Sequence, residues 1–306
     1  MVRRPRRSLP LVLATLLGLV APIVGPAPVA SAADGAIGYA MVYCELHTLD
    51  LETGELTDLP AFASPATCAA DLAVAPNGTV WGLVDIPVPT SPLRAGFVVR
   101  FNAEGEGFTH EITVEGATEA SLVTGGLAIE PDGTIYIQLS TDGPGCSLTE
   151  VCLYRYDLDT TIASPVGVSG ETSTPLEHLA SCSSGLRSMA GGQLLAVDDA
   201  TGAASPLVTI DARLLGYDCL RDSDVLHAVA GPADEVLSPQ DVTVGTVDPA
   251  TGAYTAQAVL SDPEAAVNAL AVGPAPASTT TTTTTTPATT PPAAAPGAVV
   301  TPTFTG

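Results

Sequence analysis

The fold is decided by a ten-residue pattern that is clearest in Leu127-Ala128-Ile129-Glu130-Pro131-Asp132-Gly133-Thr134-Ile135-Tyr136. Apolar, β-prone residues stand on both sides of a Pro-Asp-Gly turn, in which glycine can take the positive φ that tight turns need. The same pattern occurs in Leu72-Ala73-Val74-Ala75-Pro76-Asn77-Gly78-Thr79-Val80-Trp81, and weaker forms lie at residues 186–192 and 220–226. Each copy predicts a strand, a tight turn and a second strand.

A second turn motif, Asp-x-x-Thr-Gly, alternates with the first along the chain. It occurs at residues 50–54, 198–202 and 248–252, and degenerate copies occupy residues 102–105 and 157–161. The aspartate side chain can accept backbone N–H groups within such a turn, and the glycine again supplies a positive φ. Alternating residues before the motif and a β-prone run after it predict a second hairpin in each unit.

The spacing of the two turns predicts a repeat of four strands. The distances from Gly78 to Asn102 and from Gly133 to Asp157 are both 24 residues. The second motif recurs on average about every 50 residues, which is typical of the four-stranded blades of a β-propeller. Lone strands at residues 37–42 and 269–272 complement each other into one blade, which would close the ring and remove its exposed edge. We therefore expect an all-β fold, a β-propeller of five blades of about four strands.

One unit departs from the pattern, and one rival architecture remains. In the third unit Gly192 and Asp198 are only six residues apart, which predicts a blade of three strands. The rival fold, two β-sandwich domains, explains the alternation and the turns. It does not explain why the two ends of the repeat region complement each other.

The turn motifs resemble those of known propeller repeats. The run at residues 131–136 resembles the repeats of NHL and SMP-30/gluconolactonase-like propellers, and the Asp-x-x-Thr-Gly hairpin resembles YVTN and quinoprotein repeats. The resemblance covers most of residues 36–275 but rests on short turns, so it indicates a secreted bacterial β-propeller and no specific family. SMP-30-like enzymes hold a divalent metal with acidic and amide side chains near the axis. Asp71 and Asn268 are of those types here, but no ligand set carries over residue by residue.

The two ends of the chain differ in composition from its centre. Residues 1–32 are expected to be a signal peptide, because a basic start (Arg3 to Arg7) precedes an apolar stretch and the small residues Ala30-Ser31-Ala32. Residues 33–275 would form the propeller domain. Residues 276–306 contain eight consecutive threonines followed by prolines and alanines, which is typical of a disordered, low-complexity, Thr-rich stalk. We expect a secreted, extracellular or cell-wall-associated protein, with no membrane span after signal cleavage.

The charge balance excludes one class of partner. The 306 residues hold 10 basic and 33 acidic side chains, for a formal charge of −23. Every basic residue is an arginine, and four of the ten lie in the expected signal peptide, so the remainder would carry −27. Binding to nucleic acid depends on Lys and Arg that displace counterions from phosphates, so we expect no nucleic-acid partner.

Six cysteines fit an exported chain stabilised by disulfides. Pairing of nearest neighbours in the repeat gives Cys44–Cys68, which would join the composite blade to the next, and Cys146–Cys152, which would pinch one long loop. The third pair, Cys182–Cys219, would link the inner-strand entries of units three and four. Zinc binding is not expected, because Cys-x₂-Cys spacing is absent.

Loop lengths predict which face binds a ligand. Both turn motifs lie on one face, whereas long connections, such as residues 85–96 and 231–240, lie on the other, where we expect binding residues. His178 is the one histidine placed in such a loop. Arg187 and Arg221 each follow an aligned leucine, which predicts that they converge on the inner strands to hold an anionic ligand or to pair with acids such as Asp71.

No catalytic motif accompanies these features. The sequence contains no Gly-x-Ser-x-Gly, no His-Glu-x-x-His and no phosphate-binding loop. We therefore expect a non-enzymatic binding or interaction module with no cofactor, whose partner is an envelope or extracellular protein, a glycan or a small molecule. The alternative is a metal-dependent lactonase-type hydrolase of the SMP-30 kind that uses calcium or another divalent metal.

Overall fold

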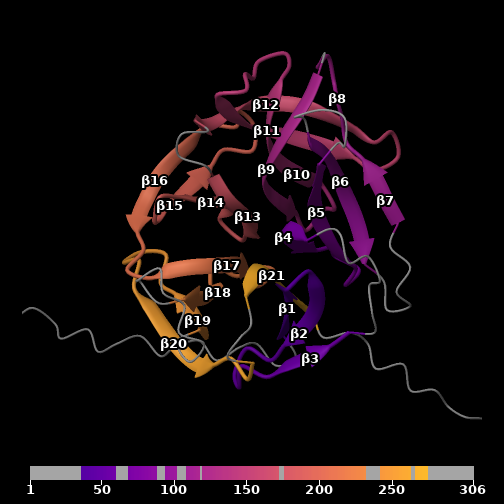
Figure 1. Ribbon diagram of the computed structural model, residues 1–306. Helices are drawn as coiled ribbons and strands as arrows, with labels where there is room; N and C mark the ends of the chain where they lie inside the picture. The colour runs from indigo at the N-terminus through magenta and orange to yellow at the C-terminus, as the bar shows by residue number, and fades with distance from the viewer. Residues whose placement is uncertain are drawn as a thin grey trace, which may run out of the picture. The chain divides into compact units, whose positions relative to one another are not determined.

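The computed structural model describes residues 36–59, 68–87, 94–101, 108–117, 119–171, 176–231, 242–262 and 266–274. Within these residues the chain forms strands β1 to β21 and no helix. The strands make five sheets placed around a central axis (Figure 1), so the fold is the five-bladed β-propeller that the repeat predicts. The expected signal peptide (1–32) and the expected stalk (276–306) lie outside the described residues.

Each blade places one strand at the axis and further strands successively outward, and we number the blades in chain order. In order from the axis, blade 1 contains β4 (Ala69–Val74), β5 (Val80–Pro87), β6 (Arg94–Phe101) and β7 (Phe108–Glu111). Blade 2 contains β9 (Glu119–Ile129), β10 (Ile135–Asp142), β11 (Glu150–Asp157) and β12 (Ile162–Glu171). The short strand β8 (Thr113–Val114) pairs in parallel with β12 and covers part of the outer edge of blade 2.

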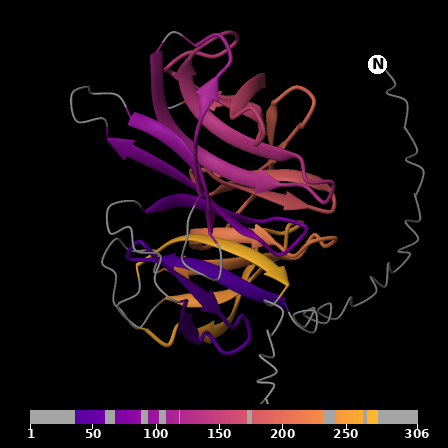
Figure 2. The same cartoon turned by 90° about the vertical axis from the view of Figure 1, so that its right-hand side faces the viewer.

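The remaining three blades have four strands each. Blade 3 contains β13 (Leu176–Cys182), β14 (Gly185–Ala190), β15 (Gln193–Val197) and β16 (Ala204–Thr209). Blade 4 contains β17 (Arg213–Cys219), β18 (Leu226–Gly231), β19 (Thr243–Val247) and β20 (Tyr254–Val259). Blade 5 contains β21 (Val267–Pro274), β1 (Ala36–Val42), β2 (Glu45–Leu49) and β3 (Leu56–Asp58). Figure 2 shows the same ring from the side.

Blade 5 closes the ring with strands from both ends of the repeat region, as predicted. The C-terminal strand β21 lies at the axis and pairs antiparallel with β1, in a register that runs from Ala36 opposite Pro274 to Val42 opposite Val267. Because closure pairs the first strand with the last, neither is left as an exposed edge.

The prediction of a three-stranded third blade is wrong. The inner strand of that blade is β13, and a turn over Ser183, Ser184 and Gly185 joins it to β14. Gly185 has φ +104° and corresponds to Gly78 and Gly133, but no Pro-Asp or Pro-Asn precedes it. The shortening arises in the next connection, where Gly191 and Gly192 alone join β14 to β15.

The Asp-x-x-Thr-Gly turns of blades 3, 4 and 5 each pack closely against the preceding blade. In blade 4 the Asp248 carboxylate accepts the Ala250 amide at 2.9 Å, as the motif predicts. Gly252 then has φ +75° and approaches the preceding blade so closely that a Cβ atom there would lie 1.9 Å from the Thr209 carbonyl oxygen. Gly54 makes the same approach to the last described strand of blade 4, at 2.4 Å from the Val259 oxygen. Glycine is therefore needed at this position for its conformation and for its size.

All three predicted disulfides are present. Cys44–Cys68 joins the β1–β2 turn of blade 5 to the segment that enters blade 1, and Cys146–Cys152 pinches the β10–β11 connection. Cys182 and Cys219 are the last residues of β13 and β17. This third bridge therefore joins the ends of two inner strands, whereas their entries were expected.

Candidate functional site

One layer of the ring contains an unusual set of side chains at the axis. It is formed by the residue directly before Leu72, Leu127, Leu179, Tyr217 and Leu270 on the five inner strands. These residues are Asp71, Gly126, His178, Gly216 and Ala269. A Cβ atom on Gly126 would lie 2.6 Å from the Leu179 Cβ, so the absence of a side chain at Gly126 allows the inner strands of blades 2 and 3 to approach closely. Only Asp71 and His178 have polar side chains to fill this layer.

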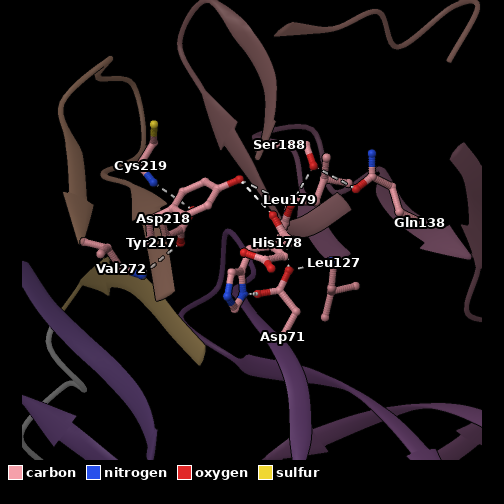
Figure 3. Close-up of polar contacts among 11 residues, drawn as sticks. Asp71, Leu127, Gln138, His178, Leu179, Ser188, Tyr217, Asp218, Cys219 and Val272 are labelled. Carbon is pink, nitrogen blue, oxygen red and sulfur yellow. Dashed lines mark hydrogen bonds and ion pairs between the residues drawn. The ribbon is translucent and has the colours of Figure 1, made fainter. Parts of the chain in front are cut away.

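Asp71, on the inner strand of blade 1, bonds to blades 2 and 3 through its two carboxylate oxygens (Figure 3). Its Oδ2 accepts the Leu127 amide at 2.7 Å and the Leu179 amide at 2.9 Å, and its Oδ1 lies 2.9 Å from the Nδ1 of His178. Asp71 is only 1% exposed. Amides of inner strands that point to the axis have no further strand to pair with, so the carboxylate provides the acceptors that they need.

His178 is buried, with 8% of its surface exposed, and its backbone has a φ of +55°. Burial lowers the pKa of its imidazole, but the charge and hydrogen bond of Asp71, the charge of Glu177 and a hydrogen bond to the Leu215 backbone together raise the pKa above its ordinary value. Nδ1 lies 2.9 Å from the Asp71 carboxylate, so this nitrogen is engaged within the protein.

Side chains of blades 2, 3 and 4 support this pair (Figure 3). The Tyr217 ring packs edge-on against the imidazole, with centroids 5.6 Å apart, and its hydroxyl donates to the His178 carbonyl at 3.3 Å. The Ser188 hydroxyl lies 2.9 Å from the same carbonyl and 3.1 Å from the Oε1 of Gln138. His178 is thus positioned by residues from four of the five blades.

A second buried carboxylate does a similar task where the inner strands end. Asp218 accepts the Cys219 amide and the Val272 amide, each at 2.8 Å. Burial raises its pKa well above the ordinary value, although these two bonds act in the opposite direction. Together with Arg221 it lines a cavity of about 30 Å³, which is room for little more than one water molecule.

A larger cavity opens at the other end of the axis, where the inner strands begin. We call it the start-side cavity. It has a volume of about 430 Å³ and is lined by residues at the starts of β13, β17 and β21 and around the β14–β15 turn. Its polar side chains are Glu177, His178, Arg213 and Asn268. Three of these, Glu177, Arg213 and Asn268, are exposed, and only His178 is buried.

The structure separates the residues that the sequence put together. Asp71 and His178 form one pair, but His178 lies on the buried inner strand β13, whereas a long loop was expected. Arg187 lies on β14, the second strand of blade 3, where its guanidinium bonds Ser184 and the Leu186 carbonyl. Arg221 lies in the turn after β17 and reaches the Val74 carbonyl at 3.4 Å. The expectation that Arg187 and Arg221 share the inner strands is therefore wrong, because Leu186 lies on the second strand of blade 3 whereas Leu220 follows the end of the inner strand of blade 4.

The sequence reasoning passed over Arg213 and Glu177. Both stand at the start of an inner strand, which is the signal that could have identified them once β13 and β17 were placed. Asn268, which lines the same cavity, is identified by the sequence only as a residue of the type that binds a metal. Among the described residues, no group of three or more His, Cys, Asp and Glu side chains is arranged to hold a metal ion. The described part of the chain also contains no helix that is long and apolar enough to cross a membrane.

Comparison with known proteins yields distant structural likenesses. No protein-family model matches the sequence, and no curated protein matches it. A protein of unknown function from Bacteroides caccae is 7% identical, with 78% of this chain and 98% of that chain covered and a TM-score of 0.41. A protein of unknown function from Dyadobacter fermentans is 11% identical, with 67% and 68% covered and a TM-score of 0.44.

A longer protein is also similar in structure. For Kuenenia stuttgartiensis hydrazine synthase the identity is 14%, the TM-score is 0.35, and 65% of this chain matches 49% of that one. The chain thus spans about half the length of that protein. The class to which the molecule belongs, the five-bladed β-propellers, is defined by its own sheet order and ring closure.

Proposed function

We propose that this propeller is a non-enzymatic binding module that works outside the cytoplasm and takes its ligand in the start-side cavity. The three disulfides support an oxidising environment, because such bonds persist mainly in exported proteins. The start-side cavity lies on the face that carries the long connections. Its volume of about 430 Å³ lies in the range of roughly 300–1,000 Å³ that is usual for small-molecule sites.

One observation carries the proposal. Glu177, Arg213 and Asn268 all line the start-side cavity, and within the described chain their side chains form neither a hydrogen bond nor an ion pair. An arginine and a glutamate that share a cavity without neutralising each other keep their hydrogen-bonding groups available for a ligand.

The buried groups beneath the cavity favour binding over chemistry. The carboxylate of Asp71 already makes three contacts, with residues of blades 2 and 3, and it is 1% exposed, so these contacts assign it a structural task. The Nδ1 of the buried His178 is engaged by the Asp71 carboxylate at 2.9 Å, so this nitrogen is not free for proton transfer. The metal-dependent hydrolase remains the alternative against which the proposal is tested.

The test is a thermal-melt screen of the purified chain. The panel contains neutral and acidic oligosaccharides, amino acids, dipeptides and calcium or zinc chloride. We expect at least one organic compound to raise the melting temperature of the wild type, and we expect Arg213→Ala and Asn268→Ala to abolish the shift. Arg221→Ala, which changes the opposite end of the axis, is the matched control and should keep the shift.

Two results would overturn the proposal. One is a panel in which no compound gives a shift that depends on Arg213 and Asn268. The other is a melting shift with calcium or zinc that EDTA abolishes, together with hydrolysis of a lactone detected by mass spectrometry. The second result would establish the metal-dependent hydrolase instead.

A further inference from the structure

We infer that the ligand of the start-side cavity is a saccharide and that Tyr43 provides the surface on which a sugar ring stacks. This inference rests on the proposed function, because it names the ligand class of the same cavity. It is argued from three features: the polar groups of the cavity, the strained turn that holds Tyr43, and the charge of the chain.

The polar side chains of the cavity match the hydroxyl groups of a sugar. Glu177 offers two acceptors, Arg213 offers a planar set of donors, and Asn268 offers one acceptor and two donors. Each sugar hydroxyl can donate and accept, and two neighbouring hydroxyls can meet the two ends of one planar group. A cavity with both charges unpaired and an amide beside them therefore suits a compound with many hydroxyls.

Tyr43 lies in a turn of unusual composition at the end of the propeller on which the cavity opens. Tyr43 and Cys44 join β1 to β2 with φ values of +49° and +70°. Two-residue hairpin turns of this kind favour asparagine and glycine, because other side chains are strained at positive φ. The Cys44–Cys68 disulfide holds the turn in place.

The turn contacts the segment that leads into the cavity lining through the backbone of Tyr43. The Tyr43 amide donates to the Ala266 carbonyl at 3.4 Å, and Ala266 directly precedes the lining residues Val267 and Asn268. The Tyr43 side chain is 56% exposed, the largest fraction among the exposed large apolar side chains of the described residues. Strained residues that the surroundings hold in place tend to mark functional positions. An exposed aromatic ring there can stack on the C–H face of a sugar.

The charge of the chain favours a neutral ligand. The formal charge is −23, so the surrounding field repels anions that approach Arg213, the arginine of the cavity lining. The field attracts cations, but Arg213 and Glu177 offset each other's charge within the cavity. A neutral polyhydroxyl compound meets neither obstacle, whereas an amino acid or dipeptide would depend on both charges.

Isothermal titration of the purified chain tests the ligand class. The probes are cellohexaose, xylohexaose, arabinohexaose and chitohexaose, with glycine and Gly-Gly as the competing class. We expect at least one hexasaccharide to bind and neither competitor to do so. Tyr43→Ala should weaken that binding about ten-fold or more, Tyr43→Phe should retain it because the ring remains, and Arg221→Ala should leave it unchanged.

The outcomes separate this inference from the proposed function. Binding of glycine or Gly-Gly that requires Arg213, with no saccharide bound, would overturn the ligand class and leave the site standing. Saccharide binding that Tyr43→Ala does not weaken would overturn the role of the tyrosine. Tyr43→Gly serves as a folding control, because it removes the ring and relieves the positive φ at the same time. If no probe binds in a manner that depends on Arg213, the proposed function falls as well.

Discussion

Replacement of Gly252 by alanine tests how the blades are fastened together. Gly252 has φ +75°, and its added Cβ would lie 1.9 Å from the Thr209 carbonyl oxygen and 2.9 Å from the Thr209 carbonyl carbon. Because these are backbone atoms, the two blades must separate until the contact reaches an ordinary distance of about 3.4 Å, a movement of roughly 1.5 Å. That movement would stretch the bond from the Asp211 amide to the Gly252 carbonyl, which is now 3.2 Å long.

The expected cost has two parts. A non-glycine residue in the left-handed conformation costs about 1–2 kcal/mol. The displaced blades lose one or two hydrogen bonds and some packing, for about a further 2–3 kcal/mol. Gly252→Ala should therefore lower the free energy of unfolding by about 3–5 kcal/mol.

A matched variant isolates the steric part of this cost. Gly192 has φ +78°, and a Cβ atom there would meet nothing within 4 Å. Gly192→Ala should therefore lose only the conformational part, about 1–2 kcal/mol. The assay is urea unfolding followed by circular dichroism, with the slopes compared so that the change in midpoint reports stability. If the two variants lose equal stability, the close approach of the turn to the preceding blade contributes nothing and the reasoning is refuted.

Three further predictions concern Thr161, His178 and the Cys182–Cys219 bridge. Thr161 has φ +58° at the position that Gly54, Gly202 and Gly252 occupy in other blades. Thr161→Gly should raise the free energy of unfolding by about 0.5–1 kcal/mol, because relief of the left-handed strain outweighs the backbone flexibility that glycine adds. A lower urea midpoint would contradict this prediction. Because the pKa of His178 is raised in the folded protein, its contribution to stability is complete below the unfolded pKa of about 6.5 and is lost as the pH rises through the folded pKa. The difference in free energy of unfolding between wild type and His178→Gln should therefore shrink from pH 6 to pH 9. A difference that stays constant with pH would count against the buried ion pair. The double variant Cys182→Ala, Cys219→Ala opens a loop with a sequence separation of 37 and should cost about 2–4 kcal/mol in thermal or urea unfolding, whereas an unchanged melting temperature would show that the bridge is dispensable.

The sequence predicted the parts of the fold that local chemistry determines. Turn residues such as Asp132-Gly133 and Asp248 to Gly252 specify hairpins by themselves, and their even spacing specified the repeat. The lone strands at residues 37–42 and 269–272 then predicted closure, because unpaired edges must be covered. Nearest-neighbour pairing in that frame was sufficient to predict all three disulfides.

The third blade and the site could not be predicted in the same way. The turn at Ser183 to Gly185 lacks the Pro-Asx signal, so the sequence pattern selects Gly191-Gly192 instead and shifts the alignment of this blade by one strand. That shift predicts Arg187 at the axis and His178 in a loop, whereas Arg187 lies on β14 and His178 on β13. The pairing of Asp71 with His178 spans 107 residues and depends on the closeness of three blades, which no local pattern encodes.

The two buried aspartates hold the inner strands together, which bears on where a ligand is proposed to bind. Inner strands of a propeller present amides to the axis, and each buried amide needs an acceptor. Asp71 satisfies Leu127 and Leu179, and Asp218 satisfies Val272, so both carboxylates are engaged in holding blades together. Both carboxylates thus have a structural task. The groups proposed to bind a ligand are instead Glu177, Arg213 and Asn268 at the strand starts, whose side chains form no hydrogen bond or ion pair within the described residues.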